Sequence, residues 1–213
     1  MVRAVIVTGG SICDYTFYNG FFRPDDFVIC ADGGIAHLIE LGVQPDLFLG
    51  DFDSCDFSSV KDLPILEHAQ IVRHAVRKNE TDTQLAVGEA LARGMKEIVI
   101  LGGIGSRADH TLANVFLLKM ILENGAEGVL LNENNEVRLL DRSTVLHPRA
   151  GRHISLLPLT AEVSGITLRG LSYPLDNFTM KMGDSIGISN EFTKDDAVIQ
   201  FKSGLLLVIL SKD

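Results

Sequence analysis

Residues 1–141 alternate short apolar runs with segments of helical character, and this alternation limits the fold more than any other feature. The apolar runs at residues 4–7 and 27–31 are followed by short segments that contain glycine or aspartate. Residues 35–41, between the runs at 27–31 and 47–49, have the pattern of a helix. Strand–helix alternation is typical of a parallel sheet. We therefore expect an α/β N-terminal domain, with a mostly parallel sheet and helices on both faces. Further strands are expected at residues 47–49, 71–72, 97–101, 128–131 and 137–140, and further helices at 81–93 and 109–122.

The pattern changes after Asp141, where Pro148 and Gly151 interrupt it and short β-like runs follow. These runs cover residues 153–157, 162–168, 184–188, 197–202 and 205–210. Ser203 and Gly204 separate the last two runs, as in a two-residue hairpin. We expect two domains, an α/β domain at 1–141 and an all-β C-terminal sandwich at 142–213.

Composition excludes several classes of protein. The formal net charge is −9, and no basic block is present, so nucleic acid is not expected as a partner. No apolar stretch approaches the ~20 residues of a membrane span, and the start lacks the apolar core of a signal peptide. Three cysteines, an odd number without a CxxC pair, favour free thiols in a reducing compartment. We expect a cytoplasmic protein without membrane contact.

An acidic turn, Gly50-Asp51-Phe52-Asp53-Ser54, follows the buried-looking run at residues 47–49. Two carboxylates at a strand end are costly unless a cation neutralises them, and Mg²⁺ prefers oxygen ligands and phosphates. We therefore interpret Asp51 and Asp53 as metal ligands. A solvated Asx-turn is the alternative.

Three more aspartates lie at comparable strand ends or helix starts. Asp32 could bind metal or a ribose hydroxyl, or cap a helix. Asp82 and Asp109 are open to the same ambiguity, because helix starts favour acids. Ligands of parallel sheets bind at the carboxyl ends of the strands. We expect all these acids to converge on one pocket for metal and phosphate.

A glycine-rich segment, Gly102-Gly103-Ile104-Gly105-Ser106-Arg107, follows a strand and precedes a helix. Glycines there let backbone N–H groups approach phosphate, and Arg107 could bind phosphate oxygens or form a surface ion pair. Lys78 is a weaker candidate of the same kind. His110 is interpreted as a positioning residue rather than an acid–base catalyst.

Taken together, these segments resemble the thiamine pyrophosphokinase family along nearly the whole chain. The matching stretches are Cys30-Ala-Asp-Gly-Gly34, Gly50-Asp-Phe-Asp-Ser54, Glu80-Thr-Asp-Thr83, Gly102-Gly-Ile-Gly-Ser-Arg-Ala-Asp-His-Thr-Leu-Ala-Asn114 and Ser189-Asn190. The resemblance implies transfer of the β,γ-diphosphate of ATP to the hydroxyethyl oxygen of thiamine, which gives thiamine diphosphate and AMP. It also implies a thiamine-binding C-terminal sandwich and a homodimer with its active site between subunits.

The resemblance assigns roles to individual residues. Asp51, Asp53 and Asp82 would bind Mg²⁺ or the phosphates that it bridges, Arg107 would hold phosphate, and Ser189 and Asn190 would meet thiamine across the interface. Asp32 and Asp109 would complete the acidic site. The remaining residues that we expect to contact the substrates are Gly33, Lys78, Thr81, Gly102 and Gly103. The chain has no tryptophan, so Tyr173 is the expected stacking partner of thiamine. Asn79 departs from the family, whose members often have an acid there.

Two other functions remain open at this point. A haloacid-dehalogenase-like phosphatase would use Asp51 as a nucleophile, but Ser54 replaces the expected Thr or Val, and its candidate acid pair, Asp195-Asp196, lies in the β-rich tail. A nucleotide- or thiamine-sensing module would keep the pocket without turnover, which only Asn79 suggests. For the kinase, direct in-line attack is expected, with Asp82 or Asp109 accepting the hydroxyl proton.

Overall fold

The computed structural model describes residues 3–51, 63–74 and 79–212, and it divides into two compact units, Met1–Glu133 and Asn134–Asp213. The boundary expected after Asp141 falls at the end of a strand that the structure groups with the second unit. Two predicted site residues, Asp53 and Lys78, lie outside the described residues. Among the described helices, none has the length and apolar character of a membrane span.

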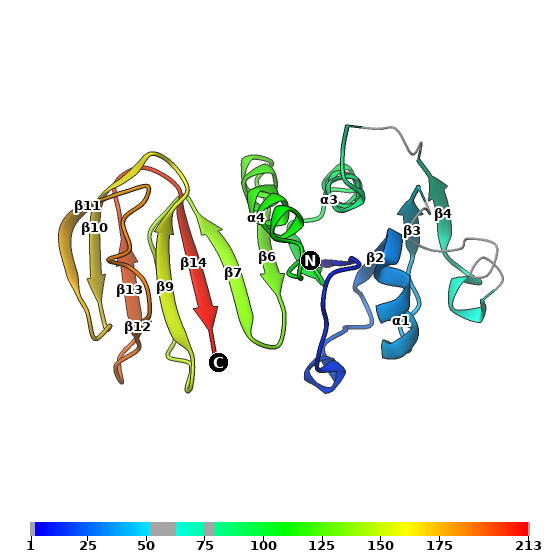
Figure 1. Cartoon of the computed structure of the whole chain (residues 1–213), viewed down its shortest axis with the longest axis horizontal. Helices are drawn as coiled ribbons and strands as arrows, with labels where there is room; N and C mark the ends of the chain where they lie inside the picture. The colour runs from blue at the N-terminus through cyan, green and yellow to red at the C-terminus, as the bar shows by residue number, and fades with distance from the viewer. Residues whose placement is uncertain (1–2, 52–62, 75–78, 213) are drawn as a thin grey trace. The chain divides into compact units, whose positions relative to one another are not determined.

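The strands of the first unit form a wholly parallel arrangement in the order β6-β5-β1-β2-β3-β4 (Figure 1). Their bounds are β1 Arg3–Val7, β2 Phe27–Ala31, β3 Leu47–Gly50, β4 Gln70–Arg73, β5 Glu97–Leu101 and β6 Glu127–Leu131. The chain progresses outward from β1 in one direction through β4, and β5 then starts the other direction. The strand order therefore reverses between β1 and β5, which is the place where such sheets open a ligand crevice.

Helices follow the strands as the alternating pattern predicted. They are α1 Ile35–Leu41, α3 Asp82–Ala92 and α4 Ala108–Glu123, with short 3-10 turns η1 Tyr15–Tyr18, η2 Asp32–Gly34 and η3 Pro64–Leu66. Thr81 caps α3 by accepting a hydrogen bond from the Gln84 backbone N–H at 3.2 Å. Gly42 ends α1 in the left-handed conformation with φ 65°.

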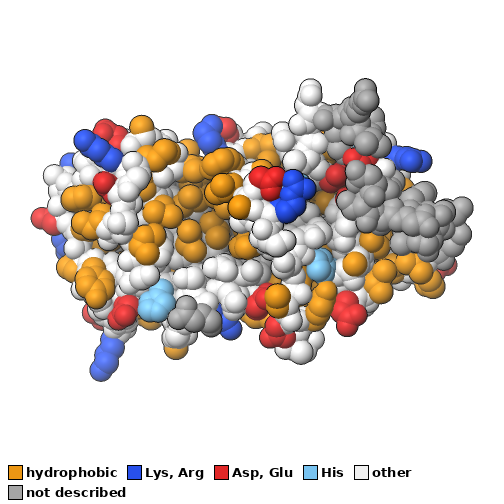
Figure 2. All heavy atoms as spheres, viewed as in Figure 1, with side chains coloured by type: hydrophobic (Ala, Val, Ile, Leu, Met, Phe, Trp, Pro, Cys, Tyr) orange, Lys and Arg blue, Asp and Glu red, His pale blue; other side chains and the backbone are white. Residues whose placement is uncertain are grey.

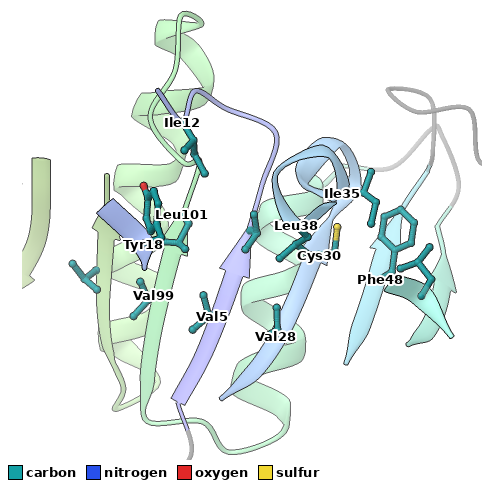
Figure 3. Packing of buried hydrophobic residues seen from close by; sticks show 13 residues of the cluster. Val5, Ile12, Tyr18, Val28, Cys30, Ile35, Leu38, Phe48, Val99 and Leu101 are labelled. Atoms are coloured by element: carbon teal, nitrogen blue, oxygen red, sulfur yellow. The ribbon is translucent and has the colours of Figure 1, made fainter. Parts of the chain in front are cut away.

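The two faces of this sheet are covered by different helices. On one face, Val5, Val28 and Cys30 pack with Leu38 of α1 in a single apolar cluster (Figure 3). This cluster includes Val129, and its neighbour Gly128 points to the other face because strand side chains alternate. A Cβ at Gly128 would approach Ile121 to 2.9 Å, so α4 packs closely on that face.

The second unit consists of strands in two antiparallel sets, β12-β9-β14-β7 and β11-β10-β13-β8. An apolar core, which includes Ile154, Val208, Ile166 and Ile199, draws its residues from both sets, as expected of a sandwich. The bounds are β7 Asn135–Leu140, β8 Thr144–Leu146, β9 His153–Pro158, β10 Glu162–Arg169, β11 Leu175–Lys181, β12 Asn190–Glu191, β13 Ala197–Gln200 and β14 Leu206–Ser211.

Two details predicted for the second unit are wrong. Residues 184–188 do not form a strand, and 186–188 are part of a turn. The strand lies earlier, at β11, where polar residues obscure the apolar alternation. Ser203 and Gly204 do not close a hairpin, because β13 and β14 belong to different strand sets. Ser203 instead bridges to Ser164, and Gly204 turns the chain between the sets with φ 100°.

Candidate active site

A pocket of about 570 Å³ opens at the carboxyl ends of the first unit's strands, where the strand order reverses. Its walls are the loops that follow β1, β2, β3 and β5, together with the starts of α3 and α4. The lining residues are Thr8, Gly9, Gly10, Ser11, Ala31, Asp32, Gly33, Asp51, Glu80, Thr81, Asp82, Thr83, Gly102, Gly103, Gly105, Ser106, Arg107, His110, Thr111 and Asn114. Most of the residues predicted for the site are therefore in one place.

Three aspartates that are distant in the sequence meet in this pocket. Asp32 follows β2, Asp51 follows β3 and Asp82 begins α3, and one carboxylate oxygen of each lies within 4.8 Å of the others. Asp32 and Asp51 are each only 8% exposed. The convergence expected of acids at strand ends and helix starts thus holds for these three residues.

The backbone around this acidic cluster is strained. Asp32 has φ 43°, a left-handed conformation that costs a non-glycine residue free energy. A Cβ at Gly50 would lie 3.1 Å from the Asp32 Cα, so the glycine before Asp51 lets the two loops approach. Buried carboxylates this close repel one another unless a cation or proton intervenes. Their all-oxygen donor set fits Mg²⁺.

The glycine-rich segment after β5 is interlocked with the loop after β1. Gly10 N–H donates to the Gly102 carbonyl at 2.8 Å, and Ser11 N–H donates to Ile104 at 3.1 Å. Gly102 has φ 65°, and a Cβ there would lie 2.1 Å from the Thr8 carbonyl. No other residue type fits this contact, so the two loops form one continuous wall of the pocket.

Helix α4 secures the same segment from the other side. The Asn114 amide donates to the Gly103 carbonyl at 2.8 Å, and the Thr111 hydroxyl accepts from Gly105 N–H at 3.1 Å. Asn114 is buried. Both residues keep the glycine loop in shape rather than leaving it free to adapt.

Arg107 and Asp109 form an exposed ion pair with two hydrogen bonds, of 2.6 and 3.2 Å. The hydrogen bond from Arg107 lowers the pKa of Asp109 to about 2. Arg107 lines the pocket, whereas Asp109 is not among its lining residues. The structure therefore separates Asp109 from the three-aspartate cluster, with which it was expected to converge.

Several lining residues were not predicted from the sequence. Thr8 and Thr83 contact each other through their hydroxyls at 3.0 Å, and Ser11, Thr111 and Asn114 also reach the pocket. The Thr8-Gly9-Gly10 segment follows a strand, as Asp32 and Asp51 do. This position at a strand end could have identified it from the sequence as part of the pocket. Thr111 and Asn114 are three positions apart near the start of α4, so their side chains lie on the same side of the helix.

In the second unit, Asn190 fixes the segment around Tyr173. Its Oδ1 accepts from Tyr173 N–H at 2.9 Å, and its Nδ2 donates to the Tyr173 carbonyl at 2.7 Å. Asn190 is 2% exposed, while Tyr173 is 64% exposed. Ser189 is exposed and has a left-handed φ of 54°. The structure thus presents Tyr173 and Ser189 at the surface and uses Asn190 to hold Tyr173.

Comparisons with known proteins agree across both units. The model of the thiamin pyrophosphokinase catalytic domain matches residues 18–130, and the model of the thiamin pyrophosphokinase vitamin B1 binding domain matches residues 142–206. The chain is 29% identical to a thiamine pyrophosphokinase of Bacillus subtilis, over 98% of each protein. A crystal structure of thiamine pyrophosphokinase from that species superposes with a TM-score of 0.90 at 28% identity and full coverage of both chains. A thiamin pyrophosphokinase family structure from Enterococcus faecalis gives 0.82 at 29% identity, with 99% of each chain covered.

Proposed function

Because the chain belongs to the thiamin pyrophosphokinase family, we propose that it transfers the diphosphate of ATP to the hydroxyethyl group of thiamine. The products are thiamine diphosphate and AMP. The observation that carries this proposal is the cluster of Asp32, Asp51 and Asp82 beside two glycine-rich loops. Such an arrangement suits a nucleoside triphosphate with its divalent cation.

Magnesium is the cation that this acidic cluster fits. Asp32, Asp51 and Asp82 would hold it, with Asp53 in the role implied by the family resemblance. When bound, the cation neutralises phosphate charge and orients the triphosphate. The protein contributes the fixed carboxylates, and the strain at Asp32 is consistent with a position retained for binding rather than for stability.

The other pocket residues position the reactants. Arg107 is placed to exchange its ion pair with Asp109 for a phosphate of the nucleotide, since a guanidinium binds either anion with paired hydrogen bonds. Asp109 is a poor proton acceptor as long as it is paired with Arg107, because that hydrogen bond lowers its pKa to about 2. Asp82, which lines the pocket, is the better candidate to accept the proton of the attacking hydroxyl.

Thiamine recognition belongs to the second unit in this proposal. The exposed ring of Tyr173 offers a face for stacking, and the backbone contacts of Asn190 hold it in place. Ser189, which directly precedes Asn190, is exposed and would offer its hydroxyl to thiamine. In this proposal Asn190 acts mainly by positioning Tyr173, in place of the direct contact with thiamine that was expected of it.

A homodimer with a shared active site completes the proposal. Leu112 and Phe116 lie one turn apart on α4 and are 55% and 57% exposed, although large apolar side chains are usually buried. Hydrophobic side chains also gather at the surface over strands of the second unit (Figure 2). A second copy of the chain would cover these residues. The odd number of cysteines without a CxxC pair is in keeping with a cytoplasmic location.

The phosphatase alternative fits the structure less well. Its acid pair, Asp195-Asp196, belongs to the second unit, where Asp196 accepts a hydrogen bond from His147 at 2.9 Å. The sensing alternative rests on Asn79 alone, which is exposed and does not line the pocket.

One incubation separates these functions. The purified chain is mixed with ATP, Mg²⁺ and thiamine, and the products are resolved by anion-exchange chromatography and ³¹P NMR. Equal amounts of thiamine diphosphate and AMP support the kinase. Inorganic phosphate without thiamine diphosphate indicates a phosphatase, and bound ligands without turnover indicate a sensor. Asp51→Asn serves as the inactive control.

A further inference from the structure

His37 of α1 joins two segments beside the pocket. Its Nε2 lies 2.7 Å from the Gly10 carbonyl oxygen, and its Nδ1 lies 2.7 Å from the Tyr15 hydroxyl. Gly10 belongs to the pocket wall, and Tyr15 begins the η1 turn. His37 itself is not among the residues that line the pocket.

The Gly10 carbonyl determines which ring nitrogen of neutral His37 carries the hydrogen. A backbone carbonyl can only accept, so Nε2 must carry the hydrogen in the contact with Gly10. In the neutral imidazole, Nδ1 then has a lone pair and accepts from Tyr15. Burial raises the pKa of the Tyr15 phenol, with a further contribution from Glu40, so Tyr15 stays protonated as a donor.

The Gly10 carbonyl is a sensitive point in the wall. A Cβ on Gly10 would lie 2.0 Å from the Gly102 carbonyl, and one on Gly9 would lie 3.2 Å from the Gly33 Cα. The loop that follows β1 is thus wedged between the turn that contains Asp32 and the loop that contains Gly102. A shift of the Gly10 peptide would displace both neighbours.

We infer that His37 is a positioning residue, which, oriented by Tyr15, fixes the Gly10 peptide and thereby the part of the pocket wall that faces the nucleotide. The inference takes the identity of the ligands from the proposed function. It assigns the β1 loop to ATP rather than to thiamine, because this loop contacts the glycine-rich segment and the turn of Asp32. His37 supports this geometry without touching either substrate.

Three variants test the inference. His37→Ala removes both contacts, Tyr15→Phe removes the orienting hydroxyl, and His37→Gln keeps an N–H donor near the position of Nε2. We expect His37→Ala to raise the KM for ATP about tenfold and Tyr15→Phe about threefold, as befits one or two lost hydrogen bonds. The KM for thiamine should change by less than about twofold, and Gln should recover most of the affinity for ATP.

The matched control is His147→Ala, which removes an exposed histidine that pairs with Asp196 in the second unit. It should leave both KM values unchanged. Equal increases for ATP and thiamine in His37→Ala, or equal losses in the Ala and Gln variants, would refute the inference. A lowered melting temperature with unchanged KM values would do the same, because it would show a purely structural role.

A spectroscopic measurement tests the same contact without turnover. Long-range ¹H–¹⁵N correlation spectra of the wild-type chain should show His37 as the Nε2–H tautomer, with an Nδ1 signal that moves in Tyr15→Phe. Addition of ATP should shift the His37 signals, whereas thiamine alone should not. The opposite tautomer, or no response to ATP, would overturn the inference. A wild-type chain that makes no AMP would instead refute the proposed function.

Discussion

Replacement of Asp51 by asparagine should make the metal-free protein more stable while abolishing its activity. The change keeps the shape of the side chain and removes one negative charge from the acidic cluster of Asp32, Asp51 and Asp82. Activity falls because the cluster loses a ligand for the cation. Stability rises because the remaining carboxylates no longer face a third charge.

The magnitude follows from the spacing of the cluster. Two unit charges 4.8 Å apart repel by about 3.5 kcal/mol at an effective dielectric constant of about 20. Asp51 faces two such neighbours, and relaxation of the surrounding structure reduces the sum of the two repulsions. We therefore expect a net gain of about 1–3 kcal/mol, which at this chain length raises the melting temperature by about 2–4 °C per kcal/mol.

Differential scanning calorimetry in EDTA and in Mg²⁺ provides the assay. Mg²⁺ should raise the melting temperature of the wild-type chain much more than that of Asp51→Asn. Asp176→Asn, which changes an exposed carboxylate of β11, is the matched control and should respond as the wild type does. If Asp51→Asn melts lower than the wild type in EDTA and gains as much from Mg²⁺, the reasoning about repulsion and metal binding is wrong.

Three further predictions concern the pocket wall, the exposed ion pair and the second unit. Asn114→Ala leaves the buried Gly103 carbonyl without its donor, so it should lower the free energy of unfolding by about 1–3 kcal/mol in urea titrations, and an unchanged stability would contradict this. Because Arg107 lowers the pKa of Asp109 to about 2, the pair forms above the ordinary aspartate pKa and is lost only as the pH falls through the lowered value. The KM for ATP should therefore show no titration of Asp109 between about pH 5 and pH 8, and a transition there that Asp109→Asn abolishes would refute the assignment. Asn190→Ala releases the Tyr173 backbone, so calorimetric titration should show thiamine affinity lowered about tenfold and ATP affinity nearly unchanged. Equal losses for both ligands would remove thiamine binding from this unit.

Sequence reasoning predicted the first unit well because its signals are local. The runs at residues 27–31 and 97–101 and the helix at 35–41 are β2, β5 and α1 at the expected bounds. The positions of Asp32 and Asp51 at strand ends and of Asp82 at a helix start then predicted that the three meet, because the carboxyl ends of parallel strands share one edge.

The remaining features depend on contacts that a linear pattern does not contain. Asp109 is at a helix start as expected, yet it forms an ion pair with Arg107 and is not part of the cluster of Asp32, Asp51 and Asp82. The path of residues 203–204 is decided by which strands pair, and β14 pairs with β7 and β9 rather than with β13. The role of His37 likewise requires knowing that its ring reaches Gly10, which is 27 positions away.

The most direct test of the account is to locate the metal. Crystals of the chain grown with Mn²⁺ in place of Mg²⁺ and a non-hydrolysable ATP analogue would give an anomalous difference map at the manganese edge. The account predicts a peak in contact with the carboxylates of Asp32, Asp51 and Asp82, with the triphosphate on its other side. A bound nucleotide whose manganese lies away from these three aspartates would contradict it.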